Sequence, residues 1–334
     1  MTQEILSILQ KDFPLNKRPF LEIAKRLNTD EKTIINIIKT QKEKNIIRQI
    51  SPIFDTKRLG YRSSLVAFKI EKRDIKEAIK FINSHPGVSH NYERNHSFNI
   101  WFTIAIDSDS KLGLEKTVQI LANKAKAKDF IILPTIKLFK IAVKLDTTGK
   151  EPTKEKLIKK EFKDITLSPL QKEIIKYSQE DIDITQEPFQ QVIDQVGIDY
   201  ELFFKELNTL KESGVMRRFA AILNHRKAGF SANAMVVWDI DEKDANHVGE
   251  IVAEFSQVSH CYLRPKYPNW QYNLFSMIHG KTKEQTDSLI DQIASEIEYK
   301  DKKALYSTRE FKKVRLKYFT PEFSKWEEVY TPIS

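Results

Sequence analysis

The sequence predicts an α+β protein built from two similar halves, each a winged helix-turn-helix followed by a β-α-β-β-α-β domain. A seven-residue phrase indicates the duplication, because residues 88–94 (VSHNYER) return 170 residues later as 258–264 (VSHCYLR). Predicted helices and strands follow in the same order around each copy. The chain therefore resembles a dimer whose subunits have been fused head to tail.

Further correspondences support the duplication and set the domain boundaries. Residues 47–50 (IRQI) align with 216–219 (MRRF), and Gly60-Tyr61 aligns with Gly229-Phe230. A lysine-rich segment with few apolar residues, 147–163, predicts a solvated linker. We divide the chain into a winged helix-turn-helix (1–50), a ferredoxin-like domain (51–146), a linker (147–165), a second winged helix-turn-helix (166–219) and a second ferredoxin-like domain (220–334).

The start of each half predicts the winged helix-turn-helix. An apolar stripe covers 19–27, a cap-rich turn follows at 28–30, and a second helix over 33–44 leads into a strand. Helix, turn, helix and strand in this order are typical of a winged helix-turn-helix. The second half repeats the pattern with a helix at 188–196, a turn, and a helix at 200–212.

The remainder of each half alternates strands and helices in the ferredoxin-like order. In the first half we predict strands at 62–70, 88–95, 98–106 and 131–143, with helices at 74–84 and 111–127. In the second half we predict strands at 230–240, 257–264, 271–279 and 304–318, with helices at 242–256 and 282–298. The repeated phrase lies on the second strand of each domain.

The composition predicts an ordinary globular protein. With 334 residues the chain is long enough for two or three domains that each bury a core. No apolar run approaches the roughly 20 residues that a membrane-spanning helix needs, and the first residues lack the pattern of a secretory signal. We therefore expect a cytoplasmic protein with no membrane partner. The single cysteine, Cys261, excludes an intramolecular disulfide and an all-cysteine metal site.

A winged helix followed by a ferredoxin-like domain resembles the Lrp/AsnC transcription regulators, which implies DNA binding. The net charge of +9 fits an acidic partner, but its distribution argues against a duplex. Residues 179–212 hold nine acids and two lysines, a net charge of −7, and the second recognition helix opens Asp199-Tyr200-Glu201. The first head holds ten cations against five acids over 10–48, yet its recognition helix opens Asp30-Glu31. We expect no nucleic-acid partner and keep a ligand-responsive regulator as the alternative.

The repeated phrases themselves predict a binding surface. Side chains at i, i+2 and i+4 of a strand share one face. His90, Tyr92 and Arg94 therefore point the same way, as do their counterparts His260, Tyr262 and Arg264 in the second copy. Each copy supplies a proton donor, a phenol and a fixed cation, which suits a polyanionic ligand. Cys261 is out of phase and should face away.

The residues around these phrases resemble the siroheme decarboxylases. Residues 90–102 (HNYERNHSFNIWF) resemble one subunit type of that family. Residues 260–265, Trp270, Tyr272 and 277–280 (MIHG) resemble the partner subunit type, as do 216–219 and 224–230 (NHRKAGF). The chain thus looks like a fused heterodimer, and the resemblance covers both halves.

The resemblance implies an Lrp/AsnC-type fold that binds a tetrapyrrole. It implies non-oxidative removal of CO2 from the ring C and D acetates of siroheme, giving 12,18-didecarboxysiroheme in an alternative haem biosynthesis pathway. We expect no required cofactor and no protein metal site, because the iron belongs to the substrate. A haem-binding carrier without turnover is a further alternative. The sequence leaves open which half holds the reactive acetate and whether the fused chain associates further.

Candidate roles follow from the chemistry that such a substrate requires. A proton must reach carbon after CO2 leaves, and histidine is a suitable donor near neutral pH. The candidate donors are His90, His260 and His96, with Tyr92 and Tyr262 orienting them or contacting a carboxylate. Guanidinium grips carboxylate through two hydrogen bonds, and the candidate arginines are Arg94, Arg264, Arg48, Arg217 and Arg218. The aromatic residues expected as walls of the pocket are Trp270 and Tyr272, together with Trp101 and Phe275.

The remaining histidines mostly have simpler structural interpretations. His225 lies in a turn and fits a surface residue, an iron ligand or a carboxylate contact. We expect His85 to cap a helix end, His247 to be solvated, and His279 to lie in the core or in the pocket. Strand histidines are often structural and aromatic residues are more often core than pocket. His90 and His260 stand out because both copies repeat them in phase with Tyr and Arg.

Overall fold

The structure is a computed structural model that describes residues 1–11, 13–141, 165–223 and 232–331. The chain forms two compact units, and each combines segments from both halves of the sequence. The helical unit contains Met1–Tyr61, Glu161–Lys227 and Lys317–Pro321. The sheet unit contains Arg62–Lys160, Ala228–Leu316 and Glu322–Ser334.

The helical unit holds both predicted winged helix-turn-helix segments. The elements of the first half are α1 (Thr2–Lys11), α2 (Pro19–Arg26), α3 (Glu31–Glu43) and β1 (Ile47–Phe54). Those of the second half are α6 (Pro169–Ser178), α7 (Gln190–Val196), α8 (Tyr200–Glu212) and β7 (Met216–Leu223). Asp30 and Asp199 cap α3 and α8 by accepting backbone N–H groups at 2.9 Å and 2.8 Å. The predicted order of helices and strand is confirmed in both halves.

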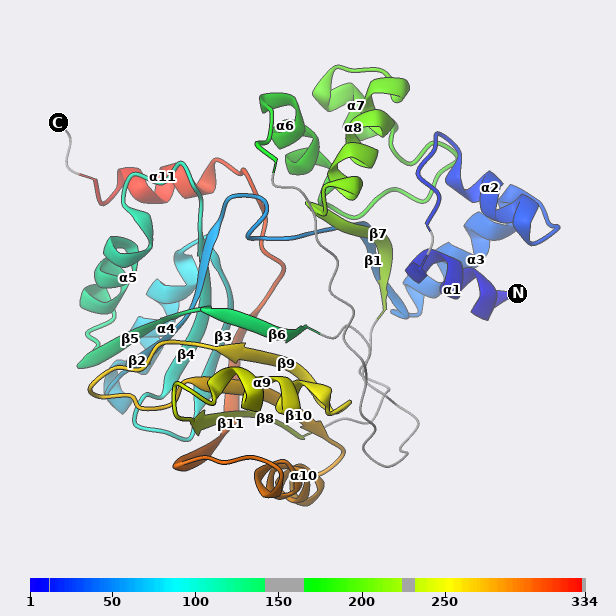
Figure 1. Cartoon of the computed structure of the whole chain (residues 1–334). Coiled ribbons are helices and arrows are strands. Elements are labelled where there is room, and N and C mark those ends of the chain that lie inside the picture. The colour runs from blue at the N-terminus through cyan, green and yellow to red at the C-terminus, as the bar shows by residue number, and fades with distance from the viewer. Residues whose placement is uncertain (12, 142–164, 224–231, 332–334) are drawn as a thin grey trace. The chain divides into compact units, whose positions relative to one another are not determined.

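Strand pairing and an aromatic cluster join the two heads within this unit. β1 and β7 pair antiparallel, with Ile50 opposite Ala221 (Figure 1). Phe13 stacks on Phe219 with a centroid distance of 5.0 Å and meets the edge of Phe189 at 6.4 Å. Main-chain hydrogen bonds and buried aromatic area therefore hold the two heads as one body.

The sheet unit contains one sheet of nine strands. Its strands are β2 (Arg62–Lys69), β3 (Val88–Arg94), β4 (Ile100–Ile106), β5 (Asp129–Pro134), β6 (Lys137–Ile141), β8 (Ala232–Asp239), β9 (Val258–Leu263), β10 (Leu274–Gly280) and β11 (Asp301–Lys313). Its helices are η1 (Lys72–Asp74), α4 (Ile75–Ser84), α5 (Gly113–Lys124), α9 (Ala245–Glu254), α10 (Lys283–Ser295) and α11 (Glu322–Glu328). The strand order is β5-β2-β4-β3-β11-β8-β10-β9-β6. The predicted β-α-β-β-α-β order is confirmed in each half.

The last strand of each half differs from the prediction. The expected strand over 131–143 is two strands, because Pro134 has no N–H to continue the ladder and the chain turns after it. β5 pairs with β2 of its own half, whereas β6 pairs with β9 of the other half (Figure 1). β11 pairs first with β8 through Asp301–Tyr306 and then with β3 through Ser307–Lys313. Each half therefore adds a strand to the phrase-bearing strand of the other.

Three apolar clusters stabilise the sheet unit. In one, α4 and α5 contribute residues such as Ile82 and Val118, and in a second, α9 and α10 contribute Val252 and Ile293. The third joins residues from both halves on the faces that these helices leave uncovered, including Trp101 and Met235. The two uncovered faces are thus brought together around shared core residues. No helix among the described residues is long and apolar enough to cross a membrane.

The exchanged strand β6 is packed tightly against α9, which gives a stability test. A Cβ at Gly249 would overlap the ring of Phe139, which β6 contributes to the core of the second half. Alanine improves helix propensity by up to about 1 kcal/mol, but overpacking costs about 1–3 kcal/mol. We expect Gly249→Ala to lower the free energy of unfolding in urea denaturation. The exposed His247→Ala on the same helix should not, and equal stability of both variants would contradict the packing argument.

Candidate active site

One cavity in the sheet unit collects both repeated phrases. Its volume is about 800 Å³, within the range of clefts that bind cofactor-sized ligands. The first phrase contributes His90, Tyr92 and Arg94 from β3. The second contributes Ser259, His260, Tyr262 and Arg264 from β9 and the residue that follows it. The two copies therefore line a single pocket.

A β-bulge in each phrase brings a serine beside the histidine. The pairing shifts between Val88 and His90 in β3, and at the matching place between Val258 and His260 in β9. The extra residue in each case is the repeated serine, and a bulge re-aims side chains in this way. Ser89 Oγ lies 3.0 Å from Nδ1 of His90 and Ser259 Oγ lies 2.8 Å from Nδ1 of His260. Strict alternation would have pointed both serines to the opposite face.

Beyond the bulge, the predicted phase of the phrases is confirmed. The rings of His90 and Tyr92 have centroids 6.3 Å apart, and those of His260 and Tyr262 are 6.0 Å apart. Cys261 is fully buried on the other face, with its Sγ 3.7 Å from the carbonyl oxygen of Gly249. Burial raises the pKa of this thiol, so it remains protonated.

Two buried arginines face the cavity, and neither forms an ion pair with an acid in the part of the chain that the structure describes. Arg94 and Arg264 are each 7% exposed, and burial lowers the pKa of each to about 10. Both therefore keep their charge at neutral pH. Arg94 Nη1 donates to the carbonyl of Leu305 at 2.6 Å, and Arg264 Nη1 donates to the carbonyl of Leu133. Their Nε atoms have no hydrogen-bond partner among the described residues, so each guanidinium has donors to spare.

Three further cations line the cavity. Lys283 from α10 and Arg309 and Lys313 from β11 bring the cations among the described lining residues to five, against Glu310 as the one carboxylate among them. Burial, together with Glu310, raises the pKa of Tyr92 to about 12 and keeps the phenol protonated. The cavity therefore favours an anionic ligand.

Apolar side chains line other parts of the cavity and suit a flat ring. They are Leu65, Trp101, Phe102, Met235, Phe275 and Met277. Methionine and aromatic side chains pack well against an extended π-system. The pocket combines these surfaces with cations, which is the arrangement that a planar ring with anionic substituents requires.

Three histidines of the cavity are held in the neutral form. Burial lowers the pKa of His90, and burial together with the neighbouring His90 lowers the pKa of His260. Burial, His260 and Lys313 lower the pKa of His279 to about 4. A nearby anion would raise these pKa values, because an opposite charge favours the protonated imidazole.

The expected aromatic walls Trp270 and Tyr272 lie behind the lining instead. The indole of Trp270 is 2% exposed and meets Trp101 at a centroid distance of 5.3 Å, while Tyr272 donates to Asp301 at 2.5 Å. Residues 267 and 270 pair as a β-bridge in the connection to β10, and Trp270 joins the shared core. His96 lies in the hairpin after β3 against Trp270 and does not line the cavity.

Other candidate residues are not among those that line the cavity. Arg48, Arg217 and Arg218 belong to the helical unit, where Arg217 donates to Asp55 at 2.7 Å. Arg48 lies on β1, and Arg217 and Arg218 lie on β7. Aligning the two halves of the sequence shows that these positions correspond to one another, but it does not show whether they line the same cavity as the repeated phrases. His225 lies outside the described residues.

The histidines outside the phrases fall into three environments. His85 does end helix α4, and its buried ring accepts the N–H of Gly87 at 3.0 Å and contacts Trp326. His247 is exposed on α9. His279, for which core and pocket were both open, lines the cavity. Charged lining residues that the sequence did not point to include Lys283 on α10 and three residues that depend on the crossing of β11, namely Arg309, Glu310 and Lys313.

Comparisons with known proteins agree with this geometry. The profile of the AsnC-like ligand binding domain matches residues 58–140 and 227–312, and that of the siroheme decarboxylase NirDL-like HTH domain matches 2–48 and 171–217. Siroheme decarboxylase of Hydrogenobacter thermophilus is 41% identical over 97% of this chain and 96% of its own length. The chain belongs to the siroheme decarboxylase family.

Two further matches show how the family relates to the duplication. The siroheme decarboxylase beta subunit of Methanosarcina barkeri is 41% identical over 42% of this chain and 92% of that subunit. A crystal structure of the siroheme decarboxylase NirDL with an iron-uroporphyrin III analogue superposes with a TM-score of 0.80 at 35% identity. That match covers 98% of this chain and 97% of the solved one. A separate subunit in this family thus corresponds to about half of the present chain.

The coupling between the two phrase histidines can be measured directly. His90 lowers the pKa of His260 in addition to burial. We expect His90→Asn to raise the pKa of His260, still below the ordinary value because burial persists. An NMR titration of the ligand-free protein measures this shift, with exposed His247→Asn as control. An unchanged pKa would show that the two imidazoles do not share one pocket.

Proposed function

We propose that the chain acts as a siroheme decarboxylase and removes CO2 from the ring C and D acetates of siroheme. The observation that carries this proposal is the pair Arg94 and Arg264, buried, charged and without carboxylate partners in a cavity that also holds three neutral histidines. Family membership supports the same reaction. Siroheme has a flat apolar macrocycle with acetate and propionate substituents, and the cavity offers both apolar walls and cations.

The arginines and lysines would bind the carboxylates that remain on the substrate. Arg94 and Arg264 are already desolvated, so their attraction for a carboxylate is weakly screened by water. Lys283, Arg309 and Lys313 lie nearer solvent and contribute less to affinity. The deep cations and the shallow cations together would fix the orientation of the ring.

The reaction requires proton transfer but no oxidant. The bond between the acetate methylene and its carboxyl group breaks, CO2 leaves, and the electron pair passes into the pyrrole system. A proton from an imidazolium then binds the methylene carbon, which completes a methyl group and leaves a neutral imidazole. We therefore propose that no further cofactor takes part and that the iron belongs to the substrate.

The bound substrate would itself charge the proton donor. His90 and His260 are neutral in the free protein because burial lowers the pKa of both, with a further contribution from Lys313 at His90 and from His90 at His260. Carboxylates of the substrate beside these rings raise those pKa values by the opposite effect. Protonation is thus coupled to binding, which suits residues that must donate only when substrate is present.

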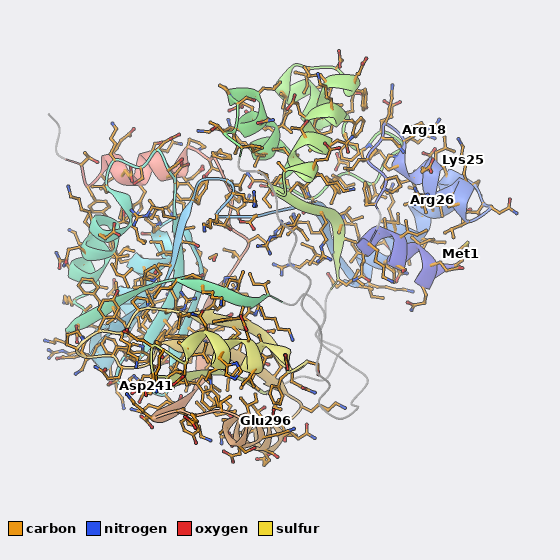
Figure 2. All side chains as sticks on the ribbon, in the orientation of Figure 1. Met1, Arg18, Lys25, Arg26, Asp241 and Glu296 are labelled. Atoms are coloured by element: carbon orange, nitrogen blue, oxygen red, sulfur yellow. The ribbon has the colours of Figure 1, made fainter. Side chains whose placement is uncertain are left out.

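The alternative function, a ligand-responsive regulator, has less support. Cations on the first head, such as Arg18, Lys25 and Arg26 (Figure 2), are partly neutralised, since Arg18 pairs with Glu31 and Arg26 with Glu22. The second head carries a net charge of −7 over 179–212, with nine acids and two lysines. A duplex carries phosphates along both strands and would meet repulsion there.

Anaerobic incubation of the protein with siroheme, followed by mass spectrometry of the tetrapyrrole, tests the proposed function. We expect successive loss of two CO2 units. Tight binding with unchanged mass would indicate a carrier or sensor instead. Salt-dependent binding to duplex DNA, with neither binding nor turnover of siroheme, would instead favour the ligand-responsive regulator.

Removing one buried cation should weaken binding far more than removing an exposed one. Breaking a buried charge pair costs about 2–5 kcal/mol, so Arg94→Met or Arg264→Met should weaken affinity for iron uroporphyrin by about 30-fold or more. Arg309→Met, at a side chain 66% exposed, should weaken it by about fivefold or less. Absorbance titration measures both. Equal losses in the three variants would contradict the assignment of the deep pair as the main anchors.

The stability of the ligand-free protein should change little in the same variants. An arginine buried without an acid carries a desolvation penalty that methionine lacks. We expect Arg94→Met and Arg264→Met to change the free energy of unfolding by no more than about 1 kcal/mol, because the lost hydrogen bond to a carbonyl offsets the gain. Urea denaturation of the ligand-free variants checks this, and a loss of several kcal/mol would assign these arginines a structural role.

A further inference from the structure

The two phrase histidines differ in what holds them. In the first phrase, Ser89 Oγ contacts Nδ1 of His90 and lies 2.9 Å from Oγ1 of Thr103. In the second phrase, Ser259 Oγ contacts Nδ1 of His260 and lies 2.5 Å from Nε2 of His279. His279 Nδ1 is in turn 2.7 Å from Oδ1 of Asn233 on β8. His260 is thus linked through Ser259 and His279 to Asn233, whereas His90 is linked only to Ser89 and Thr103.

The strand register shows that this difference is built into the two halves. Thr103 lies opposite His90, and Met277 lies opposite His260. Ala105 on β4 therefore occupies the position that His279 occupies on β10. An alanine has no hydrogen-bonding side chain, so no counterpart of the His279–Asn233 contact can form in the first half.

The hydrogen-bonding capacities along the second chain give it one direction. The amide oxygen of Asn233 only accepts, so His279 carries its proton on Nδ1 and leaves Nε2 as an acceptor. Ser259 then donates to Nε2 of His279 and accepts from Nδ1–H of His260. Nδ1 of His260 is thereby occupied, and Nε2 is the nitrogen that exchanges protons with a ligand in the cavity.

The first chain has no such direction. The hydroxyls of Ser89 and Thr103 can each donate or accept, so the pair allows either tautomer of His90. Which ring nitrogen of a histidine carries the proton is set by the hydrogen bond that the other nitrogen makes. Only in the second chain does the series of hydrogen bonds end on an atom that accepts and does not donate, the amide oxygen of Asn233.

We propose that Ser259, His279 and Asn233 are positioning residues that fix the Nδ1–H tautomer of His260 and make His260, rather than His90, the proton donor of the reaction. This inference rests on the proposed function. Its balance is simple: His260 binds a proton at Nε2, gives it to the methylene carbon that CO2 has left, and returns to the neutral Nδ1–H form. No group is oxidised or reduced.

The electrostatics around His279 support its part as an acceptor. His279 is surrounded by His260, by Lys313 of β11 and by other buried groups, and its pKa falls to about 4. It therefore stays neutral when a bound polyanion begins to charge His260. Lys283 on α10, Glu310 on β11 and His90 on β3 are the other titratable groups of the lining near this cluster. A neutral His279 can accept from Ser259 throughout the reaction.

The experiment compares variants that keep or remove the acceptor. His279→Leu removes the acceptor, and His279→Gln supplies an amide oxygen in its place. Asn233→Ala removes the exposed side chain that orients the His279 ring. Thr103→Val is the matched change in the first half. Long-range proton–nitrogen NMR of the ligand-free proteins at neutral pH reports the His260 tautomer, and the rate of CO2 release from siroheme reports the reaction.

We expect a pure Nδ1–H tautomer of His260 in the unmodified protein and in Thr103→Val, and a mixture in His279→Leu and Asn233→Ala. His279→Leu should lower kcat by about 10- to 100-fold, and His279→Gln should recover most of that loss. Thr103→Val should lose clearly less than His279→Leu. If the role of His279 were purely structural, its substitution would not change the tautomer of His260, and His279→Gln would not recover kcat.

An unchanged His260 tautomer in both His279→Leu and Asn233→Ala would overturn the positioning role, whatever the rates. Equal loss of kcat in Thr103→Val and His279→Leu would overturn the choice of His260 over His90. If the unmodified protein releases no CO2 while the tautomer still changes as expected, the proposed function fails and the positioning of His260 by His279 stands.

Discussion

The site depends on one piece of main-chain pairing, the crossing of β11 from one half of the sheet to the other. Its first residues pair with β8 and its last with β3, and β6 makes the corresponding crossing to β9. Two phrases 170 residues apart are thereby brought to one cavity. The same register sets Ser307 opposite Arg94 and leaves the carbonyl of Leu305 for its guanidinium. If each terminal strand paired only within its own half, neither arginine would have this anchor.

The cavity is held in an electrostatically costly state. Two guanidiniums are desolvated with no acid paired to them among the described residues, and three imidazoles are kept neutral by burial and by neighbouring basic groups. A buried charge costs several kcal/mol even after relaxation, and hydrogen bonds to the carbonyls of Leu305 and Leu133 offset part of it. A polycarboxylate ligand would relieve both conditions at once. The folding energy of the two cores therefore supports a pocket that is organised before the ligand arrives.

Sequence periodicity predicted the cores of both domains and the shared face of His90, Tyr92 and Arg94, because strand alternation is a local rule. It could not place Ser259, since a bulge reverses the phase there and only strand pairing reveals it. It also failed for Trp270, whose burial depends on contacts with Trp101 far away in the chain. The pairing of the crossing strands could not be predicted from sequence patterns either, because an apolar pattern does not specify which neighbouring strand a strand will pair with. Residues placed by β11 were missed for that reason.

Fusion explains why the two halves can differ at positions that face one another. In a homodimer every substitution appears twice, so a histidine at the position of His279 would appear at the position of Ala105 as well. In the fused chain the two positions vary independently. The heads show the same freedom: cations outnumber acids ten to five over 10–48, whereas 179–212 has nine acids and two lysines. A substrate whose ring substituents lack twofold symmetry needs unlike contacts on its two sides. Duplication supplied two similar phrases, and their separate divergence then allowed one histidine to be fixed for proton transfer while its counterpart kept a reversible partner.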